Sequence, residues 1–377
     1  MTNHKRPETY HKVRRSTNAS PYDFVPIGAR TEKSRALFER VQPHLFWDDP
    51  FVSGHQDKPW MHDYLMERYQ VDANTEKADP PDDLFAIPIE RFGRHTLIVG
   101  GSGGGKTRLA MHLVREQLRA GCSLVILDYK DETIRQALAI TEEVGLAPEN
   151  VTLIWPRETS YGIPRWNPLL GESSALSQRV NQFVDIMAGL FANSWGPRLE
   201  DILRNATTVI AAQGLSLIEL MEFLRNETYR TRLLAQAHGS PAYRQHPEQH
   251  RYFEVEFASM SKADKATAVN AVTNKLRVFT TTEYFRALFC DNQQNLNLES
   301  LWNRQQVILV HLDTVTLGEP GIRALVGLLT NALYAAALSV EDKNRKRETK
   351  PVPVLLTLDE LETQERYAGK ALTEILN

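Results

Sequence analysis

The chain has 377 residues, of which 42% are hydrophobic and 24% are charged, and its formal net charge is -3. This composition is typical of a soluble globular protein of two or three domains and excludes a disordered chain. This net charge does not by itself indicate nucleic-acid binding, so any contact with nucleic acid must be confined to a local basic patch or pore. The two cysteines, Cys122 and Cys290, lack metal-binding spacing, and their scarcity fits a reducing cytoplasm.

The chain opens with polar and basic residues. They include Lys5, Arg6, Lys12, Arg14 and Arg15. We interpret residues 1–30 as a disordered basic tail, and a nucleic-acid or membrane arm is the alternative. Residues 31–85 contain two helical patterns and end in a charged linker, which predicts a small helical N-terminal segment. The most apolar run, residues 324–340, is too short and mixed to span a bilayer comfortably.

The central motif follows a short apolar run, residues 96–99, which is typical of a buried parallel strand. The next eight residues fit the phosphate-loop pattern GxxxxGK[ST] without a mismatch. Residues 108–120 then carry apolar side chains at helical spacing, and Gly121 suits a left-handed helix end. The residues that we assign to nucleotide binding are Gly100, Gly101, Ser102, Gly103, Gly104, Gly105, Lys106, Thr107 and Arg108.

Each residue type in this loop has a chemical reason. Glycines let several backbone N–H groups converge on phosphates, and the start of the following helix adds its positive dipole end. Lys106 can then reach the outer phosphates of ATP, while the Thr107 hydroxyl can ligate Mg²⁺. A flexible glycine linker that ends in Lys-Thr by chance is the alternative, and the flanking strand and helix argue against it.

Residues 86–174 form the first part of the predicted ATPase core. Further buried strands are expected at residues 123–127 and 151–155. Asp128 and Lys130 follow the first of these strands, which is the ligand-binding edge of an open α/β sheet. A solvated loop explains these two residues equally well.

From residue 175 to residue 300 the apolar period becomes helical, which predicts an all-α insertion into the core. Ser216 and Glu219 form a capping box at one helix start. His246 and His250 have metal-like spacing, but Pro247 and the polar surroundings predict a solvated loop.

Four basic residues of this insertion lie on a predicted helix. They are Lys262, Lys265, Lys275 and Arg277. They either contact the backbone of DNA or form an ordinary solvated face, and the solvated face is the default.

Residues 301–377 return to the α/β pattern as the second part of the ATPase core, beginning with an apolar run at residues 306–310. The apolar run at residues 354–358 ends in Asp359 and Glu360. Asp359 can hold Mg²⁺ through water opposite Thr107, and Glu360 is placed to orient or deprotonate the attacking water. An acidic pair after a strand is a weak signal alone, but together with the phosphate loop it favours ATP hydrolysis.

The order of these motifs resembles the FtsK/HerA superfamily, and within it the coupling ATPases of type IV secretion and conjugation. The similarity covers residues 87–377, and its most specific parts are the phosphate loop, the acidic pair and the turn Asn167-Pro168-Leu169. It implies an α/β, RecA-like P-loop ATPase core with an all-α insertion. It also implies ATP and Mg²⁺ as cofactors and a ring, usually a hexamer, that pumps DNA through a central pore.

The resemblance implies residue roles only where the motifs match. Lys106 and Thr107 match the phosphate loop, Asp359 the metal-water position and Glu360 the catalytic glutamate. Arg198 is either an arginine finger for the neighbouring subunit or, more simply, a surface arginine.

Two departures from the family affect the interpretation. Coupling proteins usually begin with transmembrane helices, and the sequence predicts none, which favours a cytoplasmic protein or one held at the inner membrane through a partner. The family also has a sensor strand between the phosphate-loop strand and the acidic strand. We expect either that the sequence is truncated or that another segment fills this position, and direct pairing of the two strands would contradict both.

Three functions remain open from the sequence. The first is an ATP-driven DNA translocase or coupling motor. The second is an ATPase for protein secretion, or a HerA-like enzyme of DNA processing or defence, with a secretion-system, relaxase or nuclease partner. The third is a nucleotide-dependent assembly scaffold.

Overall fold

The computed structural model describes residues 24–29, 84–88, 96, 98, 105–171, 173–238, 241–293, 296–344 and 351–359. Most of the N-terminal helical prediction, loop residues 100–104 and Glu360 lie outside these residues. The chain forms two compact units, Met1–Cys122 and Ser123–Asn377. The predicted insertion and the later core strands thus share one unit.

The first unit contains two short strands and one helix. Strands β1 (Phe24–Ala29) and β2 (Leu84–Pro88) pair antiparallel, with a register shift between Pro26 and Gly28. The six residues of β1 lie inside the segment predicted as a disordered tail, so that prediction does not hold for them. Helix α4 (Lys106–Arg119) is the predicted helix after the phosphate loop.

Helix α4 ends as its sequence predicts. Gly121 adopts a φ of 84°, and its N–H donates to the Leu118 carbonyl at 3.0 Å. The N–H of Cys122 donates to the Gln117 carbonyl, also at 3.0 Å. A residue with a β-carbon would be strained at this φ, so glycine allows the chain to leave the helix here.

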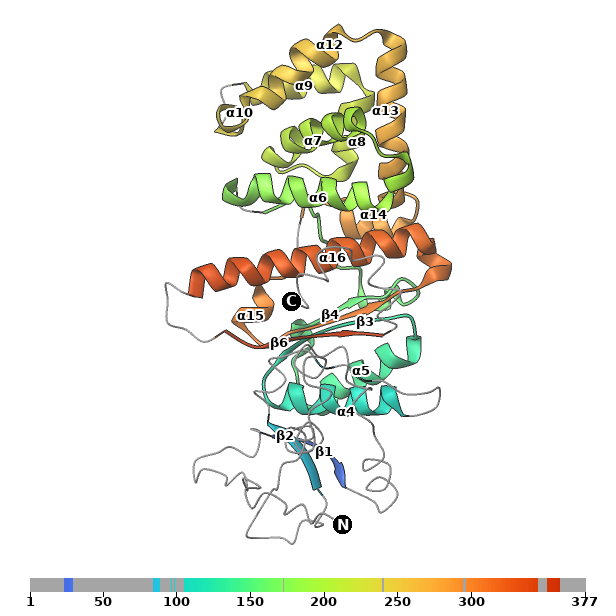
Figure 1. Ribbon diagram of the computed structural model, residues 1–377, viewed down its shortest axis with the longest axis vertical. Helices are drawn as coiled ribbons and strands as arrows, with labels where there is room; N and C mark the ends of the chain where they lie inside the picture. Colours follow the sequence, from blue (N-terminus) through green and yellow to red (C-terminus); the bar gives the residue numbers. More distant parts are fainter. Residues whose placement is uncertain are drawn as a thin grey trace, which may run out of the picture. The chain divides into compact units, whose positions relative to one another are not determined.

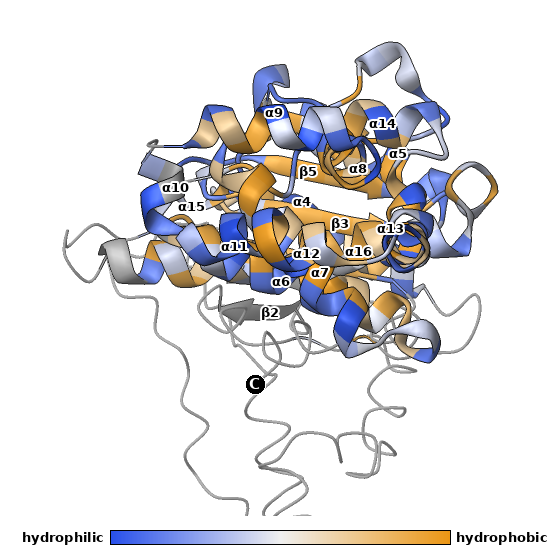
Figure 2. Cartoon of the chain, turned by 90° about the horizontal axis from the view of Figure 1, so that it is seen from above, coloured by the Kyte–Doolittle hydropathy of each residue, from blue (hydrophilic) through white to orange (hydrophobic). Residues whose placement is uncertain are grey.

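The second unit is built around a parallel sheet with the strand order β4-β5-β3-β6. The strands are β3 (Ser123–Asp128), β4 (Val151–Ile154), β5 (Val307–His311) and β6 (Val354–Leu358). Every residue of β3 and β5 is buried, and both strands are hydrophobic in Figure 2. All four strands lie within one residue of the predicted apolar runs, and the fully buried β3 and β5 have the continuous apolar sequence that a strand covered on both faces needs.

Helices cover both faces of this sheet. Helix α5 (Asp131–Glu143) lies on one face and α16 (Thr314–Asn344) on the other, with the helical insertion beyond α16 (Figure 1). The mixed α/β fold with a parallel sheet and an inserted helical region confirms the predicted fold class.

Helix α16 contains a break and a long apolar stretch. Gly318 has a φ of 67° and a ψ of 164°, so the regular helix starts after it, with Pro320 in the first turn. Within the described ranges, residues Thr314–Glu341 are long and apolar enough to cross a membrane, with a mean hydropathy of 1.5. Since 56% of that apolar window is buried inside the protein, a core helix accounts for its composition.

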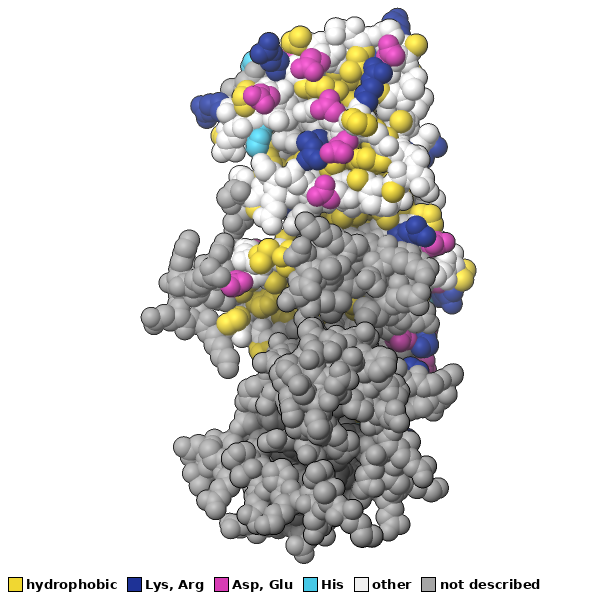
Figure 3. Space-filling model, viewed as in Figure 1, with side chains coloured by type: hydrophobic (Ala, Val, Ile, Leu, Met, Phe, Trp, Pro, Cys, Tyr) yellow, Lys and Arg dark blue, Asp and Glu magenta, His cyan; other side chains and the backbone are white. Residues whose placement is uncertain are grey.

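The insertion consists of short helices stacked beyond α16. Its longer helices are α6 (Leu176–Leu190), α7 (Pro197–Ala212), α8 (Leu217–Arg225), α9 (Glu227–Ala237), α13 (Lys262–Leu276) and α14 (Glu283–Phe289). The shorter helices of the insertion are α10 (Pro241–Gln245), α11 (Pro247–Arg251), a π-helical turn η8 (Tyr252–Glu256) and α12 (Phe257–Ser259). Its single 3-10 turns are η6 (Ser173–Ala175), η7 (Ala192–Ser194) and η9 (Arg277–Phe279). The turns η4 (Pro148–Asn150) and η5 (Thr159–Tyr161) precede the insertion, and α15 (Ser300–Asn303) follows it and contacts β3. Acidic and basic side chains are interspersed over the face of the insertion seen in Figure 3.

Two local predictions for the insertion have different outcomes. The capping box at α8 is confirmed. The Ile218 N–H donates to Ser216 Oγ at 3.2 Å, and Glu219 Oε2 accepts from the Ser216 N–H at 2.9 Å. The solvated loop around His250 is wrong. Pro247 begins helix α11 instead, and His250 is fully buried, with Nδ1 2.9 Å from the carbonyl oxygen of His246.

The Asn-Pro-Leu turn joins the core to the insertion through side-chain hydrogen bonds. Asn167 is fully buried, and its Oδ1 accepts from the Leu169 N–H at 2.9 Å. Its Nδ2 donates to the Leu215 carbonyl at 3.2 Å. Asparagine at this position therefore fixes the turn and satisfies a distant backbone acceptor.

Candidate functional site

The start of α4 has the properties of an anion-binding site. Gly105 takes the N-cap position with a φ of 83°, and Lys106 and Thr107 form the first helical residues. Glycine has no side chain to occupy the N–H groups of the first turn, and that turn contains no acidic residue. These N–H groups and the helix dipole therefore favour a phosphate at this end of the helix.

A charged cluster lies where β3 and β6 end. The two strands pair as far as Leu127 and Leu358, so Asp128, the last residue of β3, and Asp359, which follows β6, are neighbours at this edge of the sheet. The Lys130 ammonium nitrogen lies 2.6 Å from Asp359 Oδ2. Burial raises the pKa of Asp128, a hydrogen bond from the Lys130 N–H opposes that rise, and the nearby Asp359 carboxylate adds to it. One ammonium group thus lies beside two neighbouring carboxylates.

The ends of β4 and β5 carry a second polar cluster. Arg157 donates through Nε to Asp313 Oδ2 at 2.8 Å, and the Asp313 carboxylate also accepts from the Thr316 hydroxyl and the Val315 N–H. The side chain of Asp313 is 2% exposed, whereas that of Arg157 is 52% exposed. A buried carboxylate therefore fixes a guanidinium group on a side chain that remains about half exposed.

The first turn of α5 contacts the residue that follows β4. Asp131 accepts from Trp155 Nε1 at 3.0 Å and from Arg135 Nε at 2.6 Å. Desolvation would raise the pKa of Asp131, but these two hydrogen bonds outweigh it and lower the pKa below its usual value. The Arg135 guanidinium lies 4.7 Å from the centre of the buried Trp155 ring, and the exposed Tyr161 ring is parallel to that ring at 6.3 Å.

The structure places the predicted site residues in two groups. Gly105, Lys106, Thr107 and Arg108 lie at the start of α4 in the first unit, and Asp359 follows β6 in the second. Their grouping around one nucleotide stays a prediction. Among the described strands, β6 pairs with β3, while Thr96 and Ile98 belong to no strand. The expectation of a further strand beside β6 therefore also stays a prediction.

Arg198 lies in the insertion, at the first turn of α7. Its guanidinium nitrogens approach Asp264 Oδ1 and Met260 Sδ, both at 3.8 Å. The side chains of Arg198 and Asp264 are both more than half exposed. Such a pair is weak, so it leaves the finger and the surface interpretation of Arg198 both open.

Two functional candidates, Arg157 and Asp313, were absent from the sequence prediction. Both follow buried strands, the same signal that singled out Asp128 and Lys130. The signal was available, but the sequence does not show that β4 and β5 are neighbours. Without this neighbour relation, Arg157 and Asp313 are ordinary polar residues after two separate strands.

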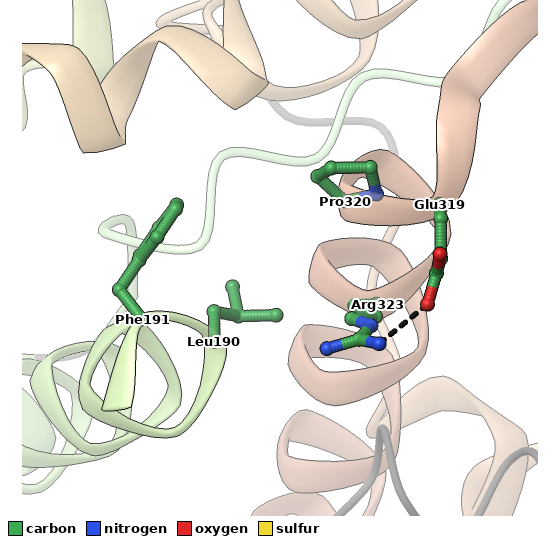
Figure 4. Close-up of a pocket in the computed structure, with 5 residues that line it drawn as sticks. All are labelled: Leu190, Phe191, Glu319, Pro320 and Arg323. Atoms are coloured by element: carbon green, nitrogen blue, oxygen red, sulfur yellow. Dashed lines mark hydrogen bonds and ion pairs between the residues drawn. The ribbon is translucent and has the colours of Figure 1, made fainter. Parts of the chain in front are cut away.

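A hollow of about 260 Å³ lies between the end of α6 and the start of α16 (Figure 4). Its lining is Leu190, Phe191, Glu319, Pro320 and Arg323. Arg323 and Glu319 form an ion pair with each other. The lining thus lacks an arrangement suited to phosphate hydrolysis.

The residue types fit a magnesium nucleotide. The Asp359 carboxylate and the Thr107 hydroxyl are hard oxygen donors of the kind that Mg²⁺ prefers. Asp359 already attracts a cation, the ammonium group of Lys130, at 2.6 Å. Within the described ranges, no group of three or more His, Cys, Asp or Glu residues could hold a metal by itself.

The chain combines a parallel sheet that has charged residues at its carboxyl edge with a phosphate-loop lysine that starts a helix. These two features define a P-loop protein of the α/β class. The family model described as "Helicase HerA, central domain" matches residues 85–332. This is more than half of the chain, so the protein belongs to the HerA central-domain family. The resemblance to the FtsK/HerA superfamily is thereby confirmed, and with it membership of a family of ATPases.

Solved structures were also matched, among them two forms of the bacterial conjugative coupling protein TrwBdeltaN70. The unbound monoclinic form is 15% identical, with a TM-score of 0.44, and the match covers 80% of this chain and 70% of that one. The trigonal form in complex with sulphate has the same identity and TM-score, with coverages of 82% and 75%. At these values the likeness carries no weight in the assignment, which rests on the family model. The search of curated proteins gave no match.

Proposed function

We propose that this protein is an ATP-hydrolysing motor of the FtsK/HerA type that translocates DNA as a ring, in conjugation or type IV secretion. The observation that carries the proposal is the start of α4, where a glycine loop leads directly into Lys106 and Thr107 at a helix end without competing carboxylates. Family membership supports ATP as the ligand. The strand-end position of Asp359 supports hydrolysis in addition to binding.

Each residue has a defined task in this proposal. The first-turn N–H groups of α4 and the Lys106 ammonium bind the β- and γ-phosphates, and Thr107 and Asp359 hold Mg²⁺. The metal neutralises phosphate charge when bound. Glu360 orients the attacking water and accepts its proton. Arg198 of a neighbouring subunit stabilises the charge that develops on the transferred phosphoryl group.

The DNA part of the proposal rests on the family and not on a basic surface. Lys265 donates to the Ala258 carbonyl at 2.7 Å, and Lys275 lies 5.5 Å from the centre of the Phe191 ring. Two of the four basic residues considered for DNA binding thus have local contacts. Since acidic and basic side chains are mixed on the face of the insertion seen in Figure 3, we expect DNA contacts to form only in the assembled ring.

ATP turnover with and without double-stranded DNA tests this function. We expect turnover that DNA stimulates, and a loss of about a hundredfold or more in Lys106→Ala and in Glu360→Gln. Arg232→Ala, a change on the exposed face of α9, is the control and should leave turnover unchanged. Stimulation by a protein substrate instead of DNA would favour a secretion ATPase. Ring assembly on ATP with no response to DNA would favour the scaffold.

A further inference from the structure

The predicted metal ligand Asp359 already has a cationic partner within the chain. Lys130 and Asp359 are 229 residues apart, and the ammonium-to-carboxylate distance is 2.6 Å. The contact follows from the sheet, since β3 and β6 are neighbours and end at the same edge. The Asp359 N–H also donates to the Leu127 carbonyl at 3.3 Å, which fixes its backbone beside β3.

The charges around this contact explain why a cation is required there. Asp128, which is 3% exposed, lies across from Asp359 at the end of the neighbouring strand. Its Oδ1 accepts from the backbone N–H of Lys130 at 2.7 Å, so the same residue contacts both carboxylates. Two carboxylates at adjacent strand ends repel each other, and the single Lys130 ammonium group offsets this repulsion.

The same contact is easy to break. The side chain of Lys130 is 54% exposed and that of Asp359 is 32% exposed, so water screens their attraction. Mg²⁺ has twice the charge of an ammonium group and prefers carboxylate oxygens. Lys130 therefore holds Asp359 strongly enough to position it and weakly enough to be displaced.

We propose that Lys130 is a positioning residue that serves as the internal counter-cation of Asp359 and gives up this carboxylate to Mg²⁺ when a magnesium nucleotide binds. The inference rests on the proposed function for the identity of the nucleotide. It predicts that the ammonium group of Lys130 competes with Mg²⁺ for one carboxylate oxygen. The Mg²⁺ concentration needed for tight nucleotide binding is then higher than Asp359 alone would require.

The first test is a Mg²⁺ titration of the binding of a fluorescent, non-hydrolysable ATP analogue to the full chain. In Lys130→Met the Mg²⁺ concentration at half-maximal binding should fall roughly three- to tenfold, because a competing positive charge is gone. Lys130→Arg retains the charge and should resemble the wild type. Analogue affinity measured in EDTA should be the same in all three chains.

Lys265→Met is the matched control, because Lys265 is a partly exposed lysine that donates to a backbone carbonyl in the insertion and not to a carboxylate. It should leave the Mg²⁺ midpoint unchanged. An unchanged midpoint in Lys130→Met would overturn the proposal and leave an ordinary surface ion pair. A weaker affinity in EDTA would also overturn it, because Lys130 would then bind phosphate directly.

A second measurement reports on Lys130 itself. An N-hydroxysuccinimide ester acylates exposed lysines, and peptide mass spectrometry measures the rate at each lysine. The rates are measured across a series of Mg²⁺ concentrations, first without nucleotide. Displacement from Asp359 should raise the rate at Lys130 several-fold and leave Lys265 unchanged. If the wild type binds no ATP analogue, the proposed function fails, and this rate still decides the inference. A rate at Lys130 that is insensitive to Mg²⁺ would contradict it.

Discussion

Asp313 shows how a single carboxylate can organise the edge of the sheet. Its side chain is buried beside β5 and accepts hydrogen bonds from Arg157, Thr316 and Val315. Desolvation would raise the pKa of this carboxyl, but the three hydrogen bonds outweigh it and lower the pKa. The charged form is therefore the form that the fold stabilises.

We expect Asp313→Asn to lower the free energy of unfolding by about 1 to 3 kcal/mol at neutral pH, since charge-assisted hydrogen bonds are lost. Because the folded pKa lies below the unfolded value of 3.8, this stabilisation is complete above pH 3.8. It is lost as the pH falls through the folded pKa. Urea denaturation of both chains between pH 7 and about pH 3 should show the difference shrinking at the acid end.

Asp185→Asn provides the control for this measurement. Asp185 lies on the exposed side of α6, so its replacement should change the free energy of unfolding by less than about 0.5 kcal/mol at neutral pH. A difference between Asp313→Asn and the wild type that grows on acidification would contradict the role of the charged form.

At the scale of elements, α16 depends on the conformation of one glycine. Gly318 has a φ of 67° and a ψ of 164°, which residues with a β-carbon rarely adopt. A β-carbon there would be 3.8 Å from Pro320 Cδ, an ordinary contact, so any cost comes from the backbone and not from a clash. We expect Gly318→Ala to lower stability by about 1 to 3 kcal/mol, seen as a thermal midpoint lower by a few degrees.

Gly189 is the matched control, because it lies inside helix α6 and a β-carbon there would meet nothing within 4 Å. Gly189→Ala should raise stability by about 0.5 to 1 kcal/mol, since alanine loses less backbone entropy in a helix. Equal thermal midpoints for the two variants would show that the break at Gly318 is not a source of strain.

Most elements with a strong local signal could be predicted from the sequence. The four strands of the parallel sheet, the end of α4 at Gly121 and the capping box at Ser216 all depend on neighbouring residues. The loop predicted around His250 was wrong because Pro247 also suits the first turn of a helix. Whether a solvated loop or a helix forms at Pro247 depends on tertiary packing. Here the packing buries His250 fully, which a solvated loop would not do.

At the scale of the whole molecule, the candidate site depends on the order of the strands. The motif for phosphate binding and the acidic residues after β6 were evident from the sequence. The pairing of β3 with both β5 and β6 was not evident, because it joins segments that are far apart in the sequence. The contact of Lys130 with Asp359 and that of Arg157 with Asp313 follow from this order. Local sequence patterns carry no information about such neighbours.

The proposed motor depends on the assembly of several chains into a ring. In a ring whose subunits act in sequence, one chain that cannot hydrolyse ATP stalls its neighbours, whereas independent chains are unaffected. We therefore expect that wild-type chains mixed with Glu360→Gln chains lose turnover more steeply than the wild-type fraction falls. The measurement is ATP turnover at constant total protein across a range of mixing ratios, after time for subunit exchange.

Wild type mixed with Arg232→Ala should keep full turnover at every ratio. A straight line for the Glu360→Gln mixtures would contradict a coupled ring, because each chain would then hydrolyse ATP independently.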